Sequence, residues 1–206
     1  MEGKLYPIFP TAIMKFRFPR KFNSAELNLF SKAKNQSIKF NGSDTISSDK
    51  LILNNPNLID IKKFCEECLE DYMRQVYNPA DSVSPEFYIT QSWINWMRKG
   101  TNHISHIHKN SIISGSFYIN ASKKYDMIEF LKKDYSEFHI LTKKYNDYNT
   151  LDVGMTVETY DLILFPSSLQ HLVSATTNPE TRVSLAFNSF IKGTLSPEDS
   201  LSYLNI

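Results

Sequence analysis

The sequence has little cysteine, little glycine and almost no net charge, and these shortages exclude several classes of protein. Cys65 and Cys68 are the only cysteines among 206 residues, so no second pair exists to complete a four-cysteine zinc site. With a net charge of only +1, the protein has no strong overall electrostatic attraction to nucleic acid or to a membrane surface. No apolar run approaches the ~18 residues of a membrane span, and MEGKLYPIFP lacks the features of a signal peptide. We expect a cytoplasmic protein that binds neither nucleic acid nor membrane.

The two cysteines form a CxxC pair, which could be half of a metal site, a redox couple or part of a core. The pair lies in a stretch, residues 56–79, whose apolar positions recur with the period of a helix. Both thiols fall on the apolar face of that helix. Burial in the core is therefore the favoured interpretation.

Two helices come early in the chain and strands dominate the rest. A helix is predicted over 24–34, capped by Asn23 or Ser24, and a second begins after Asn55, with Pro56 in its first turn, and ends near residue 79. A first strand is predicted over 12–18. At least seven more follow without an intervening helix, over 87–97, 111–120, 127–130, 154–159, 161–165, 171–176 and 182–190.

This order indicates a mainly β fold with flanking helices, built as a sandwich or a barrel of antiparallel sheets. The charged, tyrosine-rich segment 131–151 is expected to loop out between strands, either as a rim or lid or as an ordinary surface insertion.

Polar side chains alternate with apolar ones along two of the strands. Ser114, Ser116, Tyr118 and Asn120 share one face of their strand. In the last strand Arg182, Ser184, Ala186 and Asn188 share a face. A sandwich would leave these faces in water, whereas a barrel covered by the helices would enclose them as a site. The helices need a surface for their apolar faces, which favours the barrel.

Three of the five histidines lie within six residues of the stretch HISHIHKNSIISGSFYIN, residues 103–120. In an extended chain His106 and His108 point the same way with Cα atoms ~6.6 Å apart, so both rings could reach one ion. His103 has the opposite parity and is expected to point away. The plain alternative is a surface loop without metal, but imidazole is the commonest protein metal ligand.

A third ligand must come from a distant strand, and His171 is the candidate. Arg182 follows eleven residues later, past a turn at Asn178 and Pro179. If the two strands pair as a hairpin, Arg182 lies roughly three to four residues along the ladder, about 10–13 Å from His171. A small dicarboxylate bound to the metal would fill that gap, because a buried guanidinium needs an anion and suits a carboxylate.

With these residues in place, the chain resembles the 2-oxoglutarate/Fe(II)-dependent oxygenases, and most of all the small bacterial and phage oxygenases with an HxH…SGxYY…H…RxSxxFN core. The matching segments are W…RKG…HxH…SGSFYIN…DLILFPSSLQH…RVSLAFN, over about residues 91–190. The resemblance implies a double-stranded β-helix, a jelly-roll or cupin-like barrel. It also implies one oxygenase domain over 1–206. Residues 1–86 would supply a strand and supporting helices, and 87–192 the core with the 131–151 insertion.

The resemblance also assigns roles to single residues. His106 and His171 match the family's iron ligands, and Arg182 matches the residue that grips the far carboxylate of 2-oxoglutarate. Tyr118 matches a tyrosine that bonds the same carboxylate, and Ser184 stands beside it in the RxS motif. Asn95 and Asn188 are expected to border the substrate pocket. The resemblance implies Fe(II) as the cofactor and 2-oxoglutarate and dioxygen as the cosubstrates. The implied reaction hydroxylates an unidentified small molecule or peptide and releases succinate and CO2. The sequence does not decide whether the protein is a monomer or a homodimer.

The sequence departs from the family at His108, which stands where the family has a carboxylate ligand. Three imidazoles leave the iron one negative charge short of the usual set. Either His108 ligates the iron, or it lies behind the ligands and water takes its place.

Three rival interpretations remain. The first is a cupin, because Gly100, the HxH pair and Pro166 are spaced as in cupins. That family's glutamate is absent, however, and it gives Arg182 no role. The second is a tri-histidine dioxygenase that ignores 2-oxoglutarate. The third is a metal- or ligand-binding β-domain without catalysis. Arg182 and Tyr118 favour the oxygenase.

Overall fold

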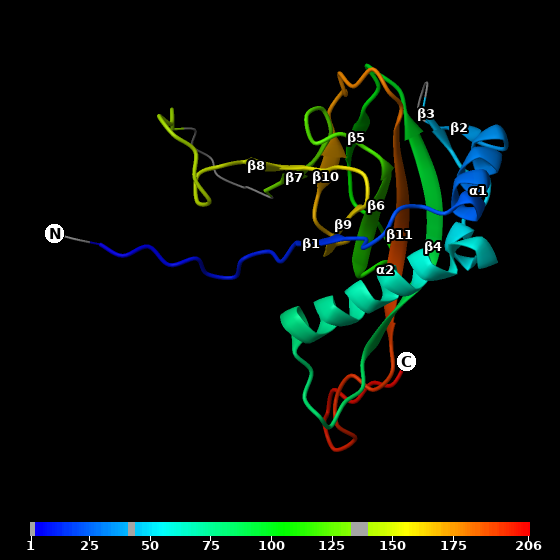
Figure 1. The fold of residues 1–206 in the computed structure, drawn as a ribbon. Helices are drawn as coiled ribbons and strands as arrows, with labels where there is room; N and C mark the ends of the chain where they lie inside the picture. The colour runs from blue at the N-terminus through cyan, green and yellow to red at the C-terminus, as the bar shows by residue number, and fades with distance from the viewer. Residues whose placement is uncertain (1–2, 41–43, 133–139) are drawn as a thin grey trace.

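The computed structural model describes residues 3–40, 44–132 and 140–206 and consists mainly of antiparallel strands, with two helices on one side (Figure 1). In chain order the elements are β1 (Met14–Arg17), α1 (Ser24–Asn35), β2 (Ile38–Phe40), β3 (Asp44–Ile46), 3₁₀ turns at Ile52–Asn54 and Pro56–Leu58, α2 (Ile59–Tyr72), a π turn at Met73–Tyr77, β4 (Glu86–Met97), β5 (His103–His106), β6 (Ile113–Asn120), β7 (Met127–Leu131), β8 (Asp152–Thr156), β9 (Asp161–Pro166), β10 (His171–Val173) and β11 (Arg182–Lys192).

The strands form two sheets. The larger has seven strands in the order β1-β9-β6-β11-β4-β3-β2, and the smaller has four in the order β5-β10-β7-β8. Every ladder between these strands is antiparallel. Both predicted helices and all predicted strands are present, so the mainly β fold is confirmed. The sequence interpretation missed β2, β3 and β5, each of which has only three or four residues.

The main hydrophobic core lies between the helices and the outer face of the larger sheet (Figure 1). Phe117 on β6 and Leu185 and Phe187 on β11 are fully buried there, against Ile61 and Leu69 of α2. These strand residues belong to the apolar faces predicted to meet the helices. Their polar neighbours along the same strands therefore face the space between the two sheets, as a barrel requires.

The two cysteines are part of this core, as predicted. Cys65 is fully buried and Cys68 nearly so, and both thiols are free. Burial raises the pKa of the Cys68 thiol to about 12 and that of Cys65 well above its ordinary value. Neutral thiols in an apolar setting bind metal poorly and are poor nucleophiles.

The start of α1 is fixed by the predicted cap. The Asn23 side chain accepts a hydrogen bond from the Glu26 amide at 2.9 Å, and the Glu26 carboxylate accepts one from the Asn23 amide at 2.7 Å. Arg20 donates to Glu26 and also to Asp60 on α2. This network joins the two helices that cover the larger sheet.

One predicted pairing is wrong: β10 and β11 do not form a hairpin. His171 lies on β10 in the smaller sheet, and Arg182 lies on β11 in the larger one. The connection between them crosses from one sheet to the other, as happens when strands of a barrel alternate between sheets. The two residues therefore line one cavity from different sheets instead of lying along one ladder.

The predicted insertion 131–151 lies between β7 and β8, which pair directly from Leu131↔Asp152 onward. Residues 133–139 of it lie outside the described part of the chain. Among the described residues, no helix has the length and apolar character needed to cross a membrane.

Candidate metal and cosubstrate site

Three histidine side chains meet inside the barrel. His106 ends β5 and His171 begins β10, and the two are direct register partners in the smaller sheet. His108 follows two residues after His106, and its backbone amide donates to Ser167 O at 2.9 Å. One ring nitrogen from each residue lies within 4.8 Å of those of the other two. The structure thus brings together the three predicted metal ligands.

Each imidazole is held by an oxygen at its Nδ1 atom. His106 Nδ1 lies 2.8 Å from the Ile104 carbonyl oxygen, and His171 Nδ1 lies 2.9 Å from that of Leu169. A carbonyl can only accept, so Nδ1 carries the proton in both rings and Nε2 keeps its lone pair. This is the tautomer that a metal-binding Nε2 requires.

His108 follows the same pattern with side chains in place of backbone. Its Nδ1 lies 2.6 Å from Asn188 Oδ1 and 2.8 Å from Ser114 Oγ. Its Nε2 lies 3.3 Å from His106 Nε2. With Nδ1 donating to the Asn188 oxygen, two Nε2 lone pairs face each other at that distance, an arrangement that a shared cation would stabilise.

The electrostatics suit a divalent metal. Burial lowers the pKa of His171 to about 4 and also lowers that of His108, in each case with a further contribution from the neighbouring histidines. His108 and His171 are thus favoured as neutral imidazoles, the form that can bind a metal. Nitrogen ligands of this kind suit Fe(II), as well as Zn(II), Ni(II) and Cu(II).

The support for His108 was not predicted from the sequence. Ser114 is fully buried, and its hydroxyl lies 2.7 Å from Ser167 Oγ, which in turn lies 2.7 Å from Ser111 Oγ. Asn188, predicted to border the substrate pocket, lines the cavity and also orients His108. Alternation placed Ser114 and Asn188 on inward faces, but no sequence signal pairs them with a histidine.

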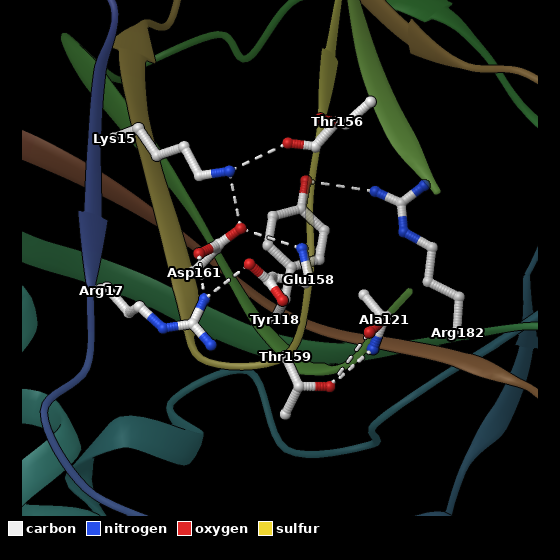
Figure 2. Close-up of polar contacts among 9 residues, drawn as sticks. All are labelled: Lys15, Arg17, Tyr118, Ala121, Thr156, Glu158, Thr159, Asp161 and Arg182. Atoms are coloured by element: carbon white, nitrogen blue, oxygen red, sulfur yellow. Dashed lines mark hydrogen bonds and ion pairs between the residues drawn. The ribbon is translucent and has the colours of Figure 1, made fainter. Parts of the chain in front are cut away.

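Arg182 lies on the inner face of the larger sheet and is buried, with 2% of its surface exposed. Nη2 donates to the Tyr118 hydroxyl at 3.2 Å (Figure 2). Nη1 donates to the Met127 carbonyl at 3.2 Å, while Nε has no partner. Both partners are neutral, and no ion pair with a carboxylate is found in the described part of the chain. A buried cation without an anion is costly. An anionic ligand therefore fits here, and Tyr118 can still donate its hydroxyl proton.

One cavity of about 520 Å³ joins these features. It is lined by the three histidines, by Arg182 and Ser184, and by Asn95 and Asn188. Tyr118 is fully buried beside Arg182 and is not part of the lining. Apart from Tyr118, the residues predicted for metal, cosubstrate and substrate thus line one cavity, as a reaction among the three would require.

His103 differs from its prediction. It was expected to point away, but it lines the cavity, because the register between β5 and β10 shifts between the His171 and Val173 pairs. Its Nε2 lies 3.4 Å from Oδ2 of Asp44, a carboxylate that is 1% exposed. Neither atom makes a hydrogen bond of ordinary geometry. His103 stays outside the three-histidine group.

We expect the metal-free protein to lose stability as the pH falls from about 6.5 to 4. Burial lowers the pKa of both His103 and His171 to about 4, below their ordinary 6.5. In that interval the unfolded chain binds protons that the folded chain excludes, so each histidine costs up to about 3 kcal/mol of folding free energy by pH 4. Burial raises the pKa of Asp44, so the folded chain takes up this proton before the unfolded chain as the pH falls. Asp44 therefore adds stability at lower pH and offsets part of the loss.

Urea unfolding of chelator-treated protein at pH 7, 5.5 and 4.5 measures this loss. His103→Gln should reduce the loss by removing one of the two groups. A midpoint that does not change over this pH range would contradict the prediction.

Comparison with known proteins agrees with this geometry. Residues 91–188 match the family described as "Putative 2OG-Fe(II) oxygenase". A prolyl-4-hydroxylase from Pseudomonas putida is similar in structure, with a TM-score of 0.54 and 11% identity over 86% of this chain and 92% of that one. The α-ketoglutarate-dependent carbocyclase SnoK of nogalamycin biosynthesis has a TM-score of 0.58 and 12% identity, over 93% and 85%.

HygX from Streptomyces hygroscopicus, solved with nickel and 2-oxoglutarate bound, has a TM-score of 0.54 and 13% identity, over 92% of this chain and 84% of that one. At these identities the structures show a shared fold. No curated protein sequence matches the chain. The matched segment runs from β4 to β11 and contains all three histidines and Arg182. Over residues 91–188, just under half of its length, the chain matches the 2-oxoglutarate- and Fe(II)-dependent oxygenases.

Proposed function

We propose that this oxygenase hydroxylates a small molecule or a peptide and converts 2-oxoglutarate to succinate and CO2. One observation carries the proposal: a buried arginine without an anion faces the same cavity as three convergent imidazoles. A metal centre alone would explain the histidines. The oxygenase reaction explains both, because its cosubstrate is a dicarboxylate that binds a metal at one end and offers a free carboxylate at the other.

We assign His106, His108 and His171 as the residues that hold Fe(II). Bound together, Fe(II) and 2-oxoglutarate supply the capacity to activate dioxygen and oxidise a C–H bond. Arg182 binds the far carboxylate through paired, charge-assisted hydrogen bonds, with Tyr118 as a further donor. Ser184, next to Arg182 along the inner face of β11, offers a hydroxyl to the same carboxylate.

The remaining residues position groups and exclude water. Asn188 and Ser114 fix the His108 ring so that Nε2 points to the metal. Asn95 borders the space left for substrate. We propose that residues 1–206 act as one oxygenase domain, in which the helices within 1–86 support the larger sheet and 87–192 carry the site.

The rival functions leave one observation unexplained. A cupin-type metal protein, or a dioxygenase that needs only three histidines, has no use for a buried Arg182. Removing a charged group from water costs several kcal/mol unless a partner compensates. The position of Arg182 inside the metal cavity favours a reaction whose cosubstrate is an anion.

Titration of the anaerobic Fe(II) protein with 2-oxoglutarate tests the function. Chelation should produce a metal-to-ligand charge-transfer band, and admission of air should then yield succinate. Metal binding without a band, and without heat of binding at millimolar 2-oxoglutarate, would overturn the proposal in favour of a cupin or a passive β-domain.

A further inference from the structure

The side of the cavity away from Arg182 is built by different residues. On the inner face of the larger sheet, β11 pairs with β4 so that Arg182 faces Met97 and Ser184 faces Asn95. Ile46 of β3 faces Asn95 from the other side. The cavity therefore extends from the Arg182 side across β4 to β3. With 2-oxoglutarate on Arg182, the space next to β4 and β3 is left for the substrate.

Lys50 is the cation of this second side. Its backbone carbonyl accepts from the Ser92 amide at 2.8 Å, which fixes the segment after β3 against β4. Lys50 lines the cavity, and its Nζ donates to the Ser47 carbonyl at 2.7 Å. The nearby Asp49 uses Oδ1 to accept from the Leu51 amide at 2.7 Å. Lys50 forms no ion pair with a described carboxylate and keeps two N–H groups for a ligand.

The cavity offers no counter-charge to Lys50. Its lining, taken over the described residues, contains no aspartate or glutamate, and its two permanent cations are Lys50 and Arg182. Burial also lowers the pKa of the Lys50 ammonium, and the charge of the neighbouring Asp49 offsets only part of that effect. An anionic group would relieve this lack of counter-charge.

The other groups on this side complete the description of a ligand. Trp93 donates through Nε1 to Asn95 Oδ1 at 3.1 Å, so the Asn95 amide hydrogens are left to donate into the cavity. Trp93, Phe40 and Ile46 give apolar walls. The surface thus combines hydrogen-bond donors with flat apolar contacts, a combination that suits an anion attached to an apolar body.

We propose that the substrate is a small organic acid whose carboxylate or phosphate binds Lys50 and whose apolar body packs on Trp93, within reach of the three histidines. The proposal rests on the proposed function, which assigns Arg182 to 2-oxoglutarate. A neutral peptide is the rival that the following experiment can reveal.

Matched acid and amide probes test the class of substrate. The anaerobic Fe(II) protein is saturated with 2-oxoglutarate, so that Arg182 is already bound to the far carboxylate of the cosubstrate. Calorimetry then compares 3-phenylpropionate with 3-phenylpropionamide, hexanoate with hexanamide, and 2-phenylethyl phosphate with 2-phenylethanol. We expect the anion to bind about 10-fold tighter or more in at least one pair, as for one charged hydrogen bond. A larger preference in the phosphate pair than in the carboxylate pairs would identify phosphate as the anion. Equal or weaker binding of the anion in every pair overturns the proposal.

Substitutions at Lys50 test whether this residue causes the preference for the anionic probe. Lys50→Met should reduce the anion preference to about twofold or less while 2-oxoglutarate affinity stays within about twofold of wild type. Lys50→Arg should keep the preference, and it serves as the folded comparison if the methionine variant is unstable. Lys63→Met, on the exposed face of α2, is the matched control. A preference that survives in Lys50→Met overturns the assignment to Lys50.

The charge-transfer band separates the two proposals. A band in the absence of any anion preference overturns the substrate class alone, and the oxygenase function stands. Absence of the band overturns the oxygenase function itself, whatever the probes do.

Discussion

Replacing Arg182 with alanine is expected to weaken 2-oxoglutarate binding by roughly 10- to 1000-fold, which corresponds to about 1.5–4 kcal/mol for a lost charged contact. Iron content should stay near that of the wild type, because Arg182 is outside the three-histidine group. The physical reason is the environment of the guanidinium, which is buried with its Nε unpaired and only neutral partners. Anaerobic titration, followed by the charge-transfer band and by calorimetry, measures the change.

Two further variants separate charge from geometry. Arg182→Lys keeps the charge but loses the forked donor, so part of the affinity should remain. Arg17→Ala removes an arginine that is half exposed and ion-paired with Glu158 and Asp161 (Figure 2), and it should leave 2-oxoglutarate binding unchanged. Wild-type affinity in Arg182→Ala would contradict the assignment.

The same substitution distinguishes a ligand-binding residue from a structural one. If Arg182 served the fold, alanine would lower stability with or without ligand. Because the cation has no anionic partner among the described residues, we expect the ligand-free alanine variant to be at least as stable as the wild type. The gain in melting temperature that 2-oxoglutarate gives the iron-loaded wild type should shrink in the variant.

Alternation made much of the site predictable. A strand presents every second residue to the same side, so Ser114, Ser184 and Asn188 could be placed on inward faces before the fold was known. The helices settled which face was inward, since the apolar faces around Phe117 and Leu185 had to meet them. The spacing of His106 and His108 gave two of the three imidazoles by the same rule.

The failures come from features that local pattern does not encode. A hairpin between β10 and β11 was the simplest interpretation of strands that follow each other, but crossing between sheets depends on the whole barrel. His103 faces inward because of a register shift in a short ladder, which reverses its parity. Asp44 was not identified because β3 has only three residues, too few to show a period. Lys50 was not identified because it follows that strand in a segment without regular alternation.

The last prediction concerns the three histidines. His106→Ala or His171→Ala should remove most of the iron, because the two remaining nitrogens hold it poorly, and His103→Ala should keep it, since that ring lies outside the group. His108→Ala is the sharpest test, and we expect it also to lose most of the iron. The reason is that Nδ1 of His108 is held by Asn188 while Nε2 faces His106 at 3.3 Å. Metal analysis after anaerobic reconstitution gives the stoichiometry.

Asn188→Leu provides an intermediate case. It leaves all three imidazoles in place but removes the 2.6 Å acceptor for His108 Nδ1, so iron affinity should fall by about 10- to 100-fold without the stoichiometry at saturating iron changing. A two-histidine site with water in the third position predicts an unchanged iron affinity in Asn188→Leu, because His108 and Asn188 would then make no contact with the metal. Wild-type iron content and an unchanged site spectrum in His108→Ala would establish that arrangement and remove His108 from the ligand set. Loss of iron in His108→Ala, with a weakened but complete site in Asn188→Leu, would establish an iron centre made of three imidazoles.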